Sequence, residues 1–258
     1  MNVLFVGDVV ADSGRKILFK KLPELKKNLE IDLCIVNGEN SACGNGVLPS
    51  SADEIFKSGA DIVTGGNHSF KRREISDYME QNECILRPYN VLENDAAGRG
   101  YIIYDMGKVS VCVINLAGTT YMDNYKNPFY EIDELLEKIN CKIKIIDFHA
   151  EATSEKLCMA HYLDGRATAL IGTHTHVRTA DAQIFPNGLG YITDVGMTGP
   201  AFSVLGIDPQ KAIKKLKSTT PVRFDYAEGK AKLDALYLEI DEKSGKTVAI
   251  KSFEILED

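Results

Sequence analysis

The chain has 258 residues, a formal net charge of −7, and 44% hydrophobic and 26% charged residues. These values are ordinary for a globular protein, and a negative chain without a basic cluster is not expected to bind duplex nucleic acid stably. No apolar stretch approaches the roughly 18 residues of a membrane span, so we expect no membrane partner.

The N-terminal segment "MNVLFVGDVV" lacks the basic flank and cleavage site of a signal peptide and is predicted to form a strand. The six cysteines are scattered, without a CxxC pair. We therefore predict a cytoplasmic protein with reduced thiols, most of them in the core; Cys43, in a glycine-rich loop, is the exception.

The first third of the chain alternates predicted strands with predicted helices. The strands are "NVLFVGD", "DLCIVNGE" and "ADIVTGGNH", and the helices are "SGRKILFKKLPELKKNL", "SSADEIFKSG" and "RREISDYMEQN". Pro23 is expected to interrupt the first helix or to begin a second one. This alternation predicts a parallel sheet with helices packed on it.

The rest of the chain adds hairpins to this pattern. A first hairpin turns at Gly107-Lys108, a second at Pro186-Asn187-Gly188, and a third joins "LDALYLEID" to "TVAIKSFEIL". Between them we predict helices at "NPFYEIDELLEKI", "SEKLCMAHYLDG" and "DPQKAIKKL", and strands at "KIKIIDFHAE" and "ATALIGTHTH". No repeat or linker is visible, so we predict a single α/β domain over residues 1–258, with a mixed sheet or two packed sheets and helices outside.

Polar residues collect where the predicted strands end. The groups are Gly7-Asp8, Asn37-Gly38-Glu39-Asn40, Gly65-Gly66-Asn67-His68, Asp147-Phe148-His149 and His174-Thr175-His176. Sites in open α/β sheets form at the carboxyl ends of strands, so these groups are expected to meet. Residues two apart in a strand face the same side, so His174 and His176 should point into one cleft.

This donor set is too large for one tetrahedral ion. It suits a pair of five- or six-coordinate ions, and mixed nitrogen and oxygen ligands favour Mn, Fe, Zn or Co. Two such ions can clamp a phosphoryl group and hold a bridging hydroxide for in-line attack. Glu39 is the expected bridging carboxylate, and Gly38 is expected to permit an unusual backbone turn beside it.

The ordered motifs resemble the calcineurin-like metallophosphoesterases, and more closely their YmdB-like branch, which hydrolyses 2′,3′-cyclic nucleotides. The resemblance rests on "GDVVADSGR", "NGENSACGNG", "GGNHSF", "HAEATSEK", "GTHTHVRTAD" and "YITDVGMTGP", which span residues 7 to 200. It implies a metallophosphoesterase-type sandwich of two mixed β-sheets flanked by helices. It also implies a phosphodiesterase that acts on small cyclic nucleotides, with Fe or Mn favoured over Zn or Co.

The resemblance assigns a role to each polar strand end. His68 would be the general acid or a donor to the phosphate. One metal would be held by Asp8, Glu39, Asn40 and His176, and the other by Glu39, Asn67, His149 and His174.

The sequence departs from the wider superfamily at three places. Val10 stands where a second metal ligand is usual, and Asn40 is its expected replacement. Glu39 replaces the usual bridging aspartate. Ser69 follows "GNH" where an acid is common, so His68 is expected to lack an orienting carboxylate.

Other readings of these residues remain open at this point. Arg178 could contact phosphate or solvent, His161 is expected to pack or to face solvent, and several acids could support ligand histidines or lie at the surface: Asp147, Glu151, Asp181 and Asp194. The alternative functions are a phosphomonoesterase or protein phosphatase of the same superfamily, and a metal-bearing RNA-associated regulatory protein with weak hydrolysis. A homo-oligomer is compatible with either.

Overall fold

The computed structural model describes residues 1–43, 45–122 and 124–257. In its first half the elements are β1 (Asn2–Val6), β2 (Asp8–Val9), α1 (Ala11–Asn28), β3 (Leu33–Asn37), α2 (Pro49–Lys57), β4 (Ile62–Thr64), α3 (Ile75–Gln81), β5 (Tyr101–Asp105) and β6 (Ser110–Ala117). In its second half they are α4 (Pro128–Lys138), β7 (Ile143–His149), α5 (Thr153–Leu163), β8 (Ala169–Thr173), β9 (Gln183–Ile184), β10 (Gly190–Ile192), β11 (Met197–Pro200), α6 (Pro209–Lys217), β12 (Ala231–Asp241) and β13 (Lys246–Leu256).

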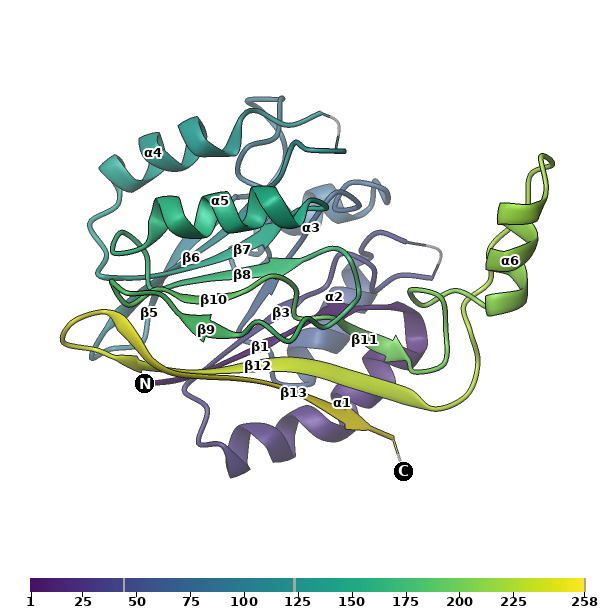
Figure 1. Ribbon diagram of the computed structural model, residues 1–258, viewed down its shortest axis with the longest axis horizontal. Coiled ribbons are helices and arrows are strands. Elements are labelled where there is room, and N and C mark those ends of the chain that lie inside the picture. The colour runs from purple at the N-terminus through teal and green to yellow at the C-terminus, as the bar shows by residue number, and fades with distance from the viewer. Residues whose placement is uncertain (44, 123, 258) are drawn as a thin grey trace.

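The strands form two mixed sheets that pack face to face (Figure 1). The first has the order β2-β11-β12-β1-β3-β4, with β13 paired to β12, and the second has the order β5-β6-β7-β8-β10-β9. Each sheet combines parallel pairs, such as β1 with β3 and β7 with β8, with antiparallel pairs at other positions. The predicted sandwich of two mixed sheets flanked by helices is therefore confirmed.

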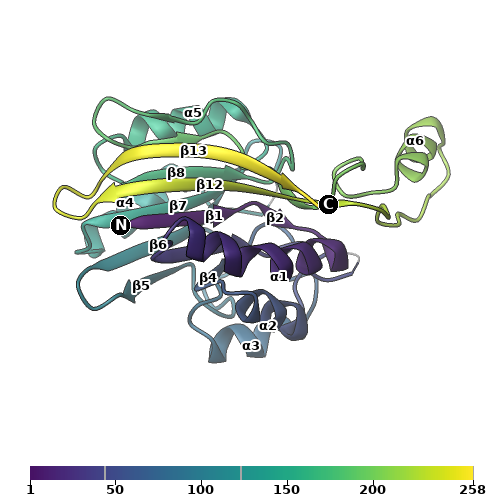
Figure 2. The ribbon, with the colours of Figure 1, turned by 90° about the horizontal axis from the view of Figure 1, so that it is seen from below.

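The side chains of β1 point alternately into two hydrophobic cores, one on each face of the first sheet. Val3 and Phe5 belong to the core between the two sheets, whereas Leu4 and Val6 belong to the core beneath α1 and α2. Successive residues of a strand point to opposite faces, so a strand buried on both sides must be apolar throughout. Seen from below, α1, α2 and α3 lie on one side of the strands and α5 on the other (Figure 2).

Two local predictions are wrong. Pro23 lies inside the continuous helix α1, where the sequence pattern suggested a break; the buried side chains of Ile17, Leu18 and Leu22 hold this helix on the sheet. Strand β8 ends at Thr173, before the two histidines that were predicted to belong to it. The hairpins β5–β6, β9–β10 and β12–β13 form as predicted.

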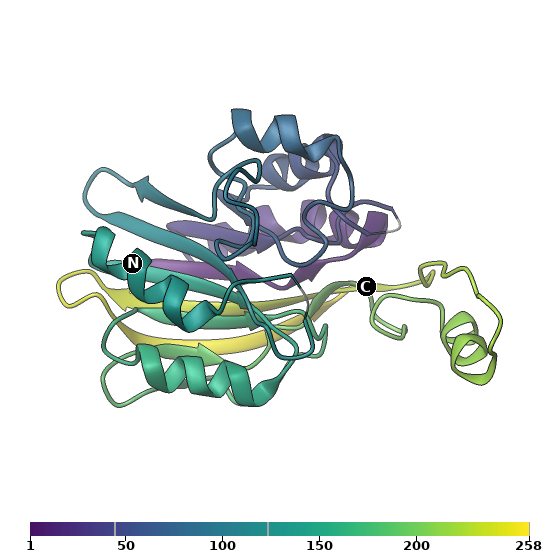
Figure 3. The same cartoon turned by 90° about the horizontal axis from the view of Figure 1, so that it is seen from above.

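Helix α6 stands apart from the body of the molecule. It projects beyond the strands, at the end opposite the turn that joins β12 and β13, in all three ribbon views (Figure 3). None of the described helices is long and apolar enough to cross a membrane.

Candidate metal centre

The five polar strand ends meet at one edge of the sandwich. Asp8 begins β2, Glu39 and Asn40 follow β3, Asn67 follows β4, and His149 ends β7. The candidate ligands form two groups whose donor atoms lie within 4.8 Å of one another, Asp8–Glu39–His176 and Glu39–His149–His174. Glu39 belongs to both groups, which is the geometry expected of a bridging carboxylate.

Glu39 is the most connected side chain of this cluster. Its Oε2 accepts a hydrogen bond of 3.0 Å from the backbone N–H of His68 and lies 3.3 Å from Nε2 of His149. Its Oε1 accepts a hydrogen bond of 2.6 Å from Nδ2 of Asn40. The side chain is only 1% exposed, so its orientation is set by these contacts.

The two amides contact different histidines of the cluster. Asn67 Oδ1 lies 2.9 Å from His149 Nε2, while Asn40 Nδ2 lies 3.3 Å from His176 Nε2. Each amide is thus next to the histidine that the resemblance assigns to the same metal, although Asn40 presents its NH2 group there and its Oδ1 lies 3.0 Å from His68 Nδ1.

His174 and His176 lie in the cluster because of the backbone turn that follows β8, and not because of alternation along a strand. Beyond the end of β8, His174 has φ 101° and His176 has φ 63°, which is left-handed backbone that non-glycine residues rarely adopt. His174 Nδ1 lies 3.0 Å from His149 Nε2, while His176 Nε2 lies 3.7 Å from Asp8 Oδ1. A strained turn therefore sends the two rings to different groups.

A buried relay fixes the ring of His149. Its Nδ1 lies 2.9 Å from Thr173 Oγ1, which in turn donates a hydrogen bond of 2.7 Å to Asp147 Oδ1. Because Thr173 uses its own proton on Asp147, it accepts the Nδ1–H of His149. Burial raises the pKa of Asp147 to about 7, against the opposing hydrogen bonds from Thr173, Thr64 and Asn37.

With Nδ1 protonated, Nε2 of His149 carries a lone pair. It faces three further atoms that also carry lone pairs, on Asn67, His174 and Glu39, at 2.9–3.3 Å. Lone pairs converging at this distance repel one another unless a cation or a proton lies between them. Asp8 Oδ1 is likewise buried with no hydrogen-bond partner among the described residues. Both observations fit metal ions.

Burial sets the protonation states of the site. It lowers the pKa of His149 to about 3, which keeps the imidazole neutral and able to bind metal. It raises the pKa of Asp8 well above its usual range, and the charge of Glu39 adds to this effect. Burial acts on Glu39 in the same direction, whereas the hydrogen bonds from the ring and the backbone N–H of His68 act to lower the pKa of Glu39.

The ring of His68 has a carboxylate partner, which is Glu39. Its Nδ1 lies 3.0 Å from Glu39 Oε1 and 3.0 Å from Asn40 Oδ1, although Ser69 replaces the usual acid. The hydroxyl of Ser69 instead donates a 2.8 Å hydrogen bond to the carbonyl of Gly66 and closes the loop. The prediction that His68 lacks an orienting carboxylate is therefore wrong.

The glycines of the site allow close packing. Gly38 is not in the left-handed region, so the predicted unusual turn is wrong; a Cβ there would meet the side chains of Val63 and Ile55. A Cβ on Gly66 would collide with Glu39 Oε2 and His149 Nε2. Gly66 thus keeps the space between these donor atoms open.

The acids near the ligand strands were expected either to support the ligand histidines or to lie at the surface, and the structure shows different positions for them. Asp194 is fully buried, pairs with the equally buried Lys156 at 2.9 Å, and accepts the backbone N–H of Thr175 at 3.0 Å. It therefore holds the turn between the two histidines. Glu151 lies on the rim, 3.2 Å from His174 Nε2, whereas Asp181 binds the hydroxyl and backbone of Thr193.

Arg178 and His161 lie outside the candidate metal centre. Arg178 Nε lies 3.4 Å from the buried carboxylate of Asp234, so this side chain already has an anionic partner. His161 is exposed on α5, with its ring 4.9 Å from that of Phe185. Neither residue lines the cavity at the metal centre.

The metal centre opens into a cavity of about 430 Å³. Its lining comes from Val10, Glu39, Asn40, Asn45, His68, Glu151, His174, Thr175, His176, Leu205, Ile207, Phe224, Asp225 and Tyr226. The arm around α6 contributes the last five of these residues, which nothing in the sequence motifs indicated. The sequence did show aromatic and apolar residues in segments 201–207 and 218–230, for which no helix or strand was predicted.

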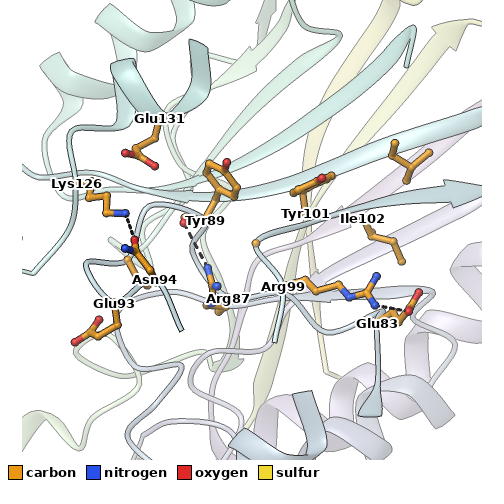
Figure 4. Close-up of a pocket in the computed structure, with 13 residues that line it drawn as sticks. Glu83, Arg87, Tyr89, Glu93, Asn94, Arg99, Tyr101, Ile102, Lys126 and Glu131 are labelled. Carbon is orange, nitrogen blue, oxygen red and sulfur yellow. Dashed lines mark hydrogen bonds and ion pairs between the residues drawn. The ribbon is translucent and has the colours of Figure 1, made fainter. Parts of the chain in front are cut away.

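A larger cavity of about 600 Å³ lies elsewhere, beside β5 (Figure 4). Its cationic side chains are already engaged: Arg99 pairs with Glu83, and Lys126 donates to Asn94. The guanidinium of Arg87 donates to backbone carbonyls of the 88–97 loop. None of the described cationic side chains around this cavity is therefore free to bind an anionic substrate, and the candidate metal centre is the stronger candidate.

Comparisons with known proteins agree with this geometry. A family model described as "YmdB-like protein" matches residues 4–253. A Bacillus subtilis (strain 168) protein named 2′,3′-cyclic-nucleotide 2′-phosphodiesterase is 42% identical over 260 residues, which cover 100% of this chain and 98% of that protein.

Solved structures show the same fold. A crystal structure of a hypothetical protein from Thermus thermophilus has a TM-score of 0.95 and 38% identity, with full coverage of both chains. A structure described as a novel phosphatase from Mycoplasma pneumoniae has a TM-score of 0.95 and 34% identity, covering 100% of this chain and 94% of that one. By fold, by length and by sequence, the chain belongs to the YmdB-like family.

Proposed function

We propose that the protein is a metal-dependent phosphodiesterase that hydrolyses small cyclic nucleotides, with 2′,3′-cyclic nucleoside monophosphates as its substrates. The observation that carries this proposal is the pair of donor groups that share Glu39. The name of the Bacillus subtilis relative supports the substrate class, and the description of the Mycoplasma pneumoniae structure as a phosphatase supports a phosphoric ester hydrolase.

The donor chemistry suggests how two cations would be held. Mixed imidazole, carboxylate and amide ligands suit Fe or Mn best, with Zn and Co as alternatives. When bound, such ions activate water and neutralise phosphate charge. We assign one ion to Asp8, Glu39, Asn40 and His176, and the other to Glu39, Asn67, His149 and His174.

His68 is assigned to the leaving group. Its Nδ1 lies 3.0 Å from oxygens of Glu39 and Asn40, and its Nε2 lies 3.3 Å from Nδ2 of Asn67. The acid role assigns the transferable proton to Nε2. In the overall reaction the oxygen of water forms a bond to phosphorus, one P–O bond to the ribose breaks, and the ribose oxygen gains the proton from Nε2. The proton that the water loses restores Nε2, so the net change is the addition of one water molecule. General acid catalysis of this kind contributes roughly 10²–10⁴-fold.

His68→Ala is expected to lower kcat for 2′,3′-cyclic AMP by roughly 10²–10⁴-fold while metal content stays unchanged. The loss should be much smaller for bis-p-nitrophenyl phosphate, whose leaving group needs no proton. Steady-state kinetics with both substrates checks this, and His161→Ala on the exposed face of α5 is the matched control. An equal loss with both substrates would argue against the acid role.

Gly66→Ala is expected to weaken metal binding, because the added methyl group would occupy the space between Glu39 and His149. Disturbing groups that orient ligands typically costs roughly 10–100-fold in metal affinity. Metal titration followed by calorimetry measures this loss, and thermal unfolding of the metal-free protein shows whether the fold is retained. Unchanged affinity in a folded variant would mean that no cation lies against Gly66.

Substrate class is tested with protein whose metal content has been measured. We expect hydrolysis of 2′,3′-cyclic AMP to a nucleoside monophosphate, with little further release of inorganic phosphate. Faster release of phosphate from 3′-AMP than opening of the cyclic ester would indicate a phosphomonoesterase instead.

We further propose that the protein works in a reducing compartment such as the cytoplasm. All six cysteines are free, and two of them, Cys43 and Cys158, are exposed. Exposed free thiols are typical of proteins that are kept reduced.

A further inference from the structure

The segment 201–230, here called the arm, is built as a paired stem with α6 at its tip. In the stem Ile207 bridges to Tyr226, the N–H of Asp208 donates to the carbonyl of Asp225 at 2.9 Å, and the N–H of Ala227 donates to the carbonyl of Gly206 at 3.0 Å. The stem leaves the sandwich beside the metal centre and carries α6 away from the body (Figures 1 and 3).

The base of the arm is part of the wall of the metal centre. Ile207, Phe224 and Tyr226 line the same cavity as Glu39 and His68. The carbonyl oxygen of Leu205 lies 3.1 Å from Nδ1 of His176, so the arm also orients a candidate metal ligand. The base of the arm, rather than α6 at its tip, therefore forms part of the mouth of this cavity.

The charge of the arm is opposite to that of the rest of the chain. The arm contains six basic and three acidic residues and so carries +3, which leaves −10 for the remainder of a chain whose total is −7. Helix α6 supplies four of the basic residues, and all four are exposed: Lys211, Lys214, Lys215 and Lys217. A polyanion would be repelled by most of the surface and attracted to this arm.

Two exposed aromatic side chains lie at the base of the arm, outside α6. Phe224 is 47% exposed on the cavity wall, and Phe202 is 78% exposed at the foot of the arm. A basic track with exposed aromatic rings is typical of proteins that bind single-stranded nucleic acid, because bases stack on the rings while cations follow the backbone.

We propose that this protein acts on the 2′,3′-cyclic phosphate end of single-stranded RNA, with the arm binding the nucleotides that precede that end. The inference rests on the proposed function and extends its substrate from mononucleotides to oligonucleotides. A cyclic phosphate of this type closes the 3′ end of a strand, so the strand leaves the site through the 5′ oxygen of the terminal ribose. The reaction remains the addition of one water molecule, which breaks one P–O bond of the cyclic ester.

A second copy of the chain is the competing occupant of the arm. Leu216 is 88% exposed and Ile213 is 48% exposed, and both would suit a protein contact. RNA is favoured because the arm continues into a site that already suits phosphate esters. The two occupants give different results in the experiment that follows.

The test compares 2′,3′-cyclic AMP with a five-nucleotide RNA that ends in a 2′,3′-cyclic phosphate. For the double variant Lys214→Glu/Lys215→Glu we expect kcat/KM on the RNA to fall at least tenfold, with the value on the mononucleotide within twofold of wild type. For wild type, three phosphate contacts predict a roughly 20-fold fall in kcat/KM on the RNA between 50 and 200 mM salt.

The matched control is Lys108→Glu/Lys243→Glu, which changes the same charge in two exposed hairpin turns at the end of the molecule away from α6. It should leave both substrates unaffected. Equal loss on both substrates together with a smaller particle in light scattering would overturn the proposal in favour of a second copy. No loss on either substrate would overturn it as well. Absence of mononucleotide turnover in wild type would contradict the proposed function itself.

Discussion

Glu39→Gln is expected to lose bound metal and nearly all turnover. Glutamine keeps the shape of the side chain but removes the negative charge that both donor groups share. The expected fall in kcat is at least the ~10²–10³-fold that removal of one charge-stabilising group typically costs. Metal analysis of the purified variant and steady-state kinetics with 2′,3′-cyclic AMP measure the two effects.

The matched control for Glu39→Gln is Glu151→Gln. Glu151 is half exposed on the rim and contacts His174 Nε2 from outside the two donor groups. This variant should retain two cations per chain at saturating metal, with a loss limited to the roughly 10–100-fold in metal affinity that is typical of a group orienting a ligand. Two bound cations and full turnover in Glu39→Gln would show that Glu39 does not bridge.

Lys156→Met is expected to be strongly destabilising, although it lies outside the metal centre. The ammonium of Lys156 is fully buried, donates to the carbonyl of Thr173 at 2.8 Å and pairs with Asp194 at 2.9 Å. Removing one partner of a buried ion pair leaves an uncompensated charge and typically costs about 3–5 kcal/mol. Denaturant unfolding of the metal-free protein measures the loss.

The double variant Lys156→Met/Asp194→Asn separates charge from packing. The amide carries no charge and can still accept the N–H of Thr175, so part of the lost stability should return. A change of less than about 1 kcal/mol in Lys156→Met, within the range of exposed pairs, would mean that solvent reaches this pair.

The sequence predicted where the donors would meet because strand order controls it. Asp8, Glu39, Asn67 and His149 each lie at or just beyond the end of an apolar strand, and such ends share an edge in an α/β fold. The argument failed for His174 and His176, since β8 ends one residue earlier. Their placement depends on left-handed backbone that side-chain alternation cannot reveal.

The positions of other residues of the site could not be predicted from the sequence. Leu205 orients His176 through its backbone carbonyl, and any residue type offers that atom. Lys156 occurs in an ordinary helical segment, and only the packing of α5 on β8 buries it beside Asp194. The role of Gly38 was misread for the same reason, because its tight contacts come from α2 and β4, far away in the sequence.

Anomalous diffraction from crystals grown with Mn²⁺ tests the central claim most directly. Two strong peaks per chain are expected, one among Asp8, Glu39 and His176 and one among Glu39, His149 and His174, with Glu39 contacting both. A single peak, or peaks that leave Glu39 without a metal contact, would contradict a shared-carboxylate pair and the phosphodiesterase mechanism that depends on it.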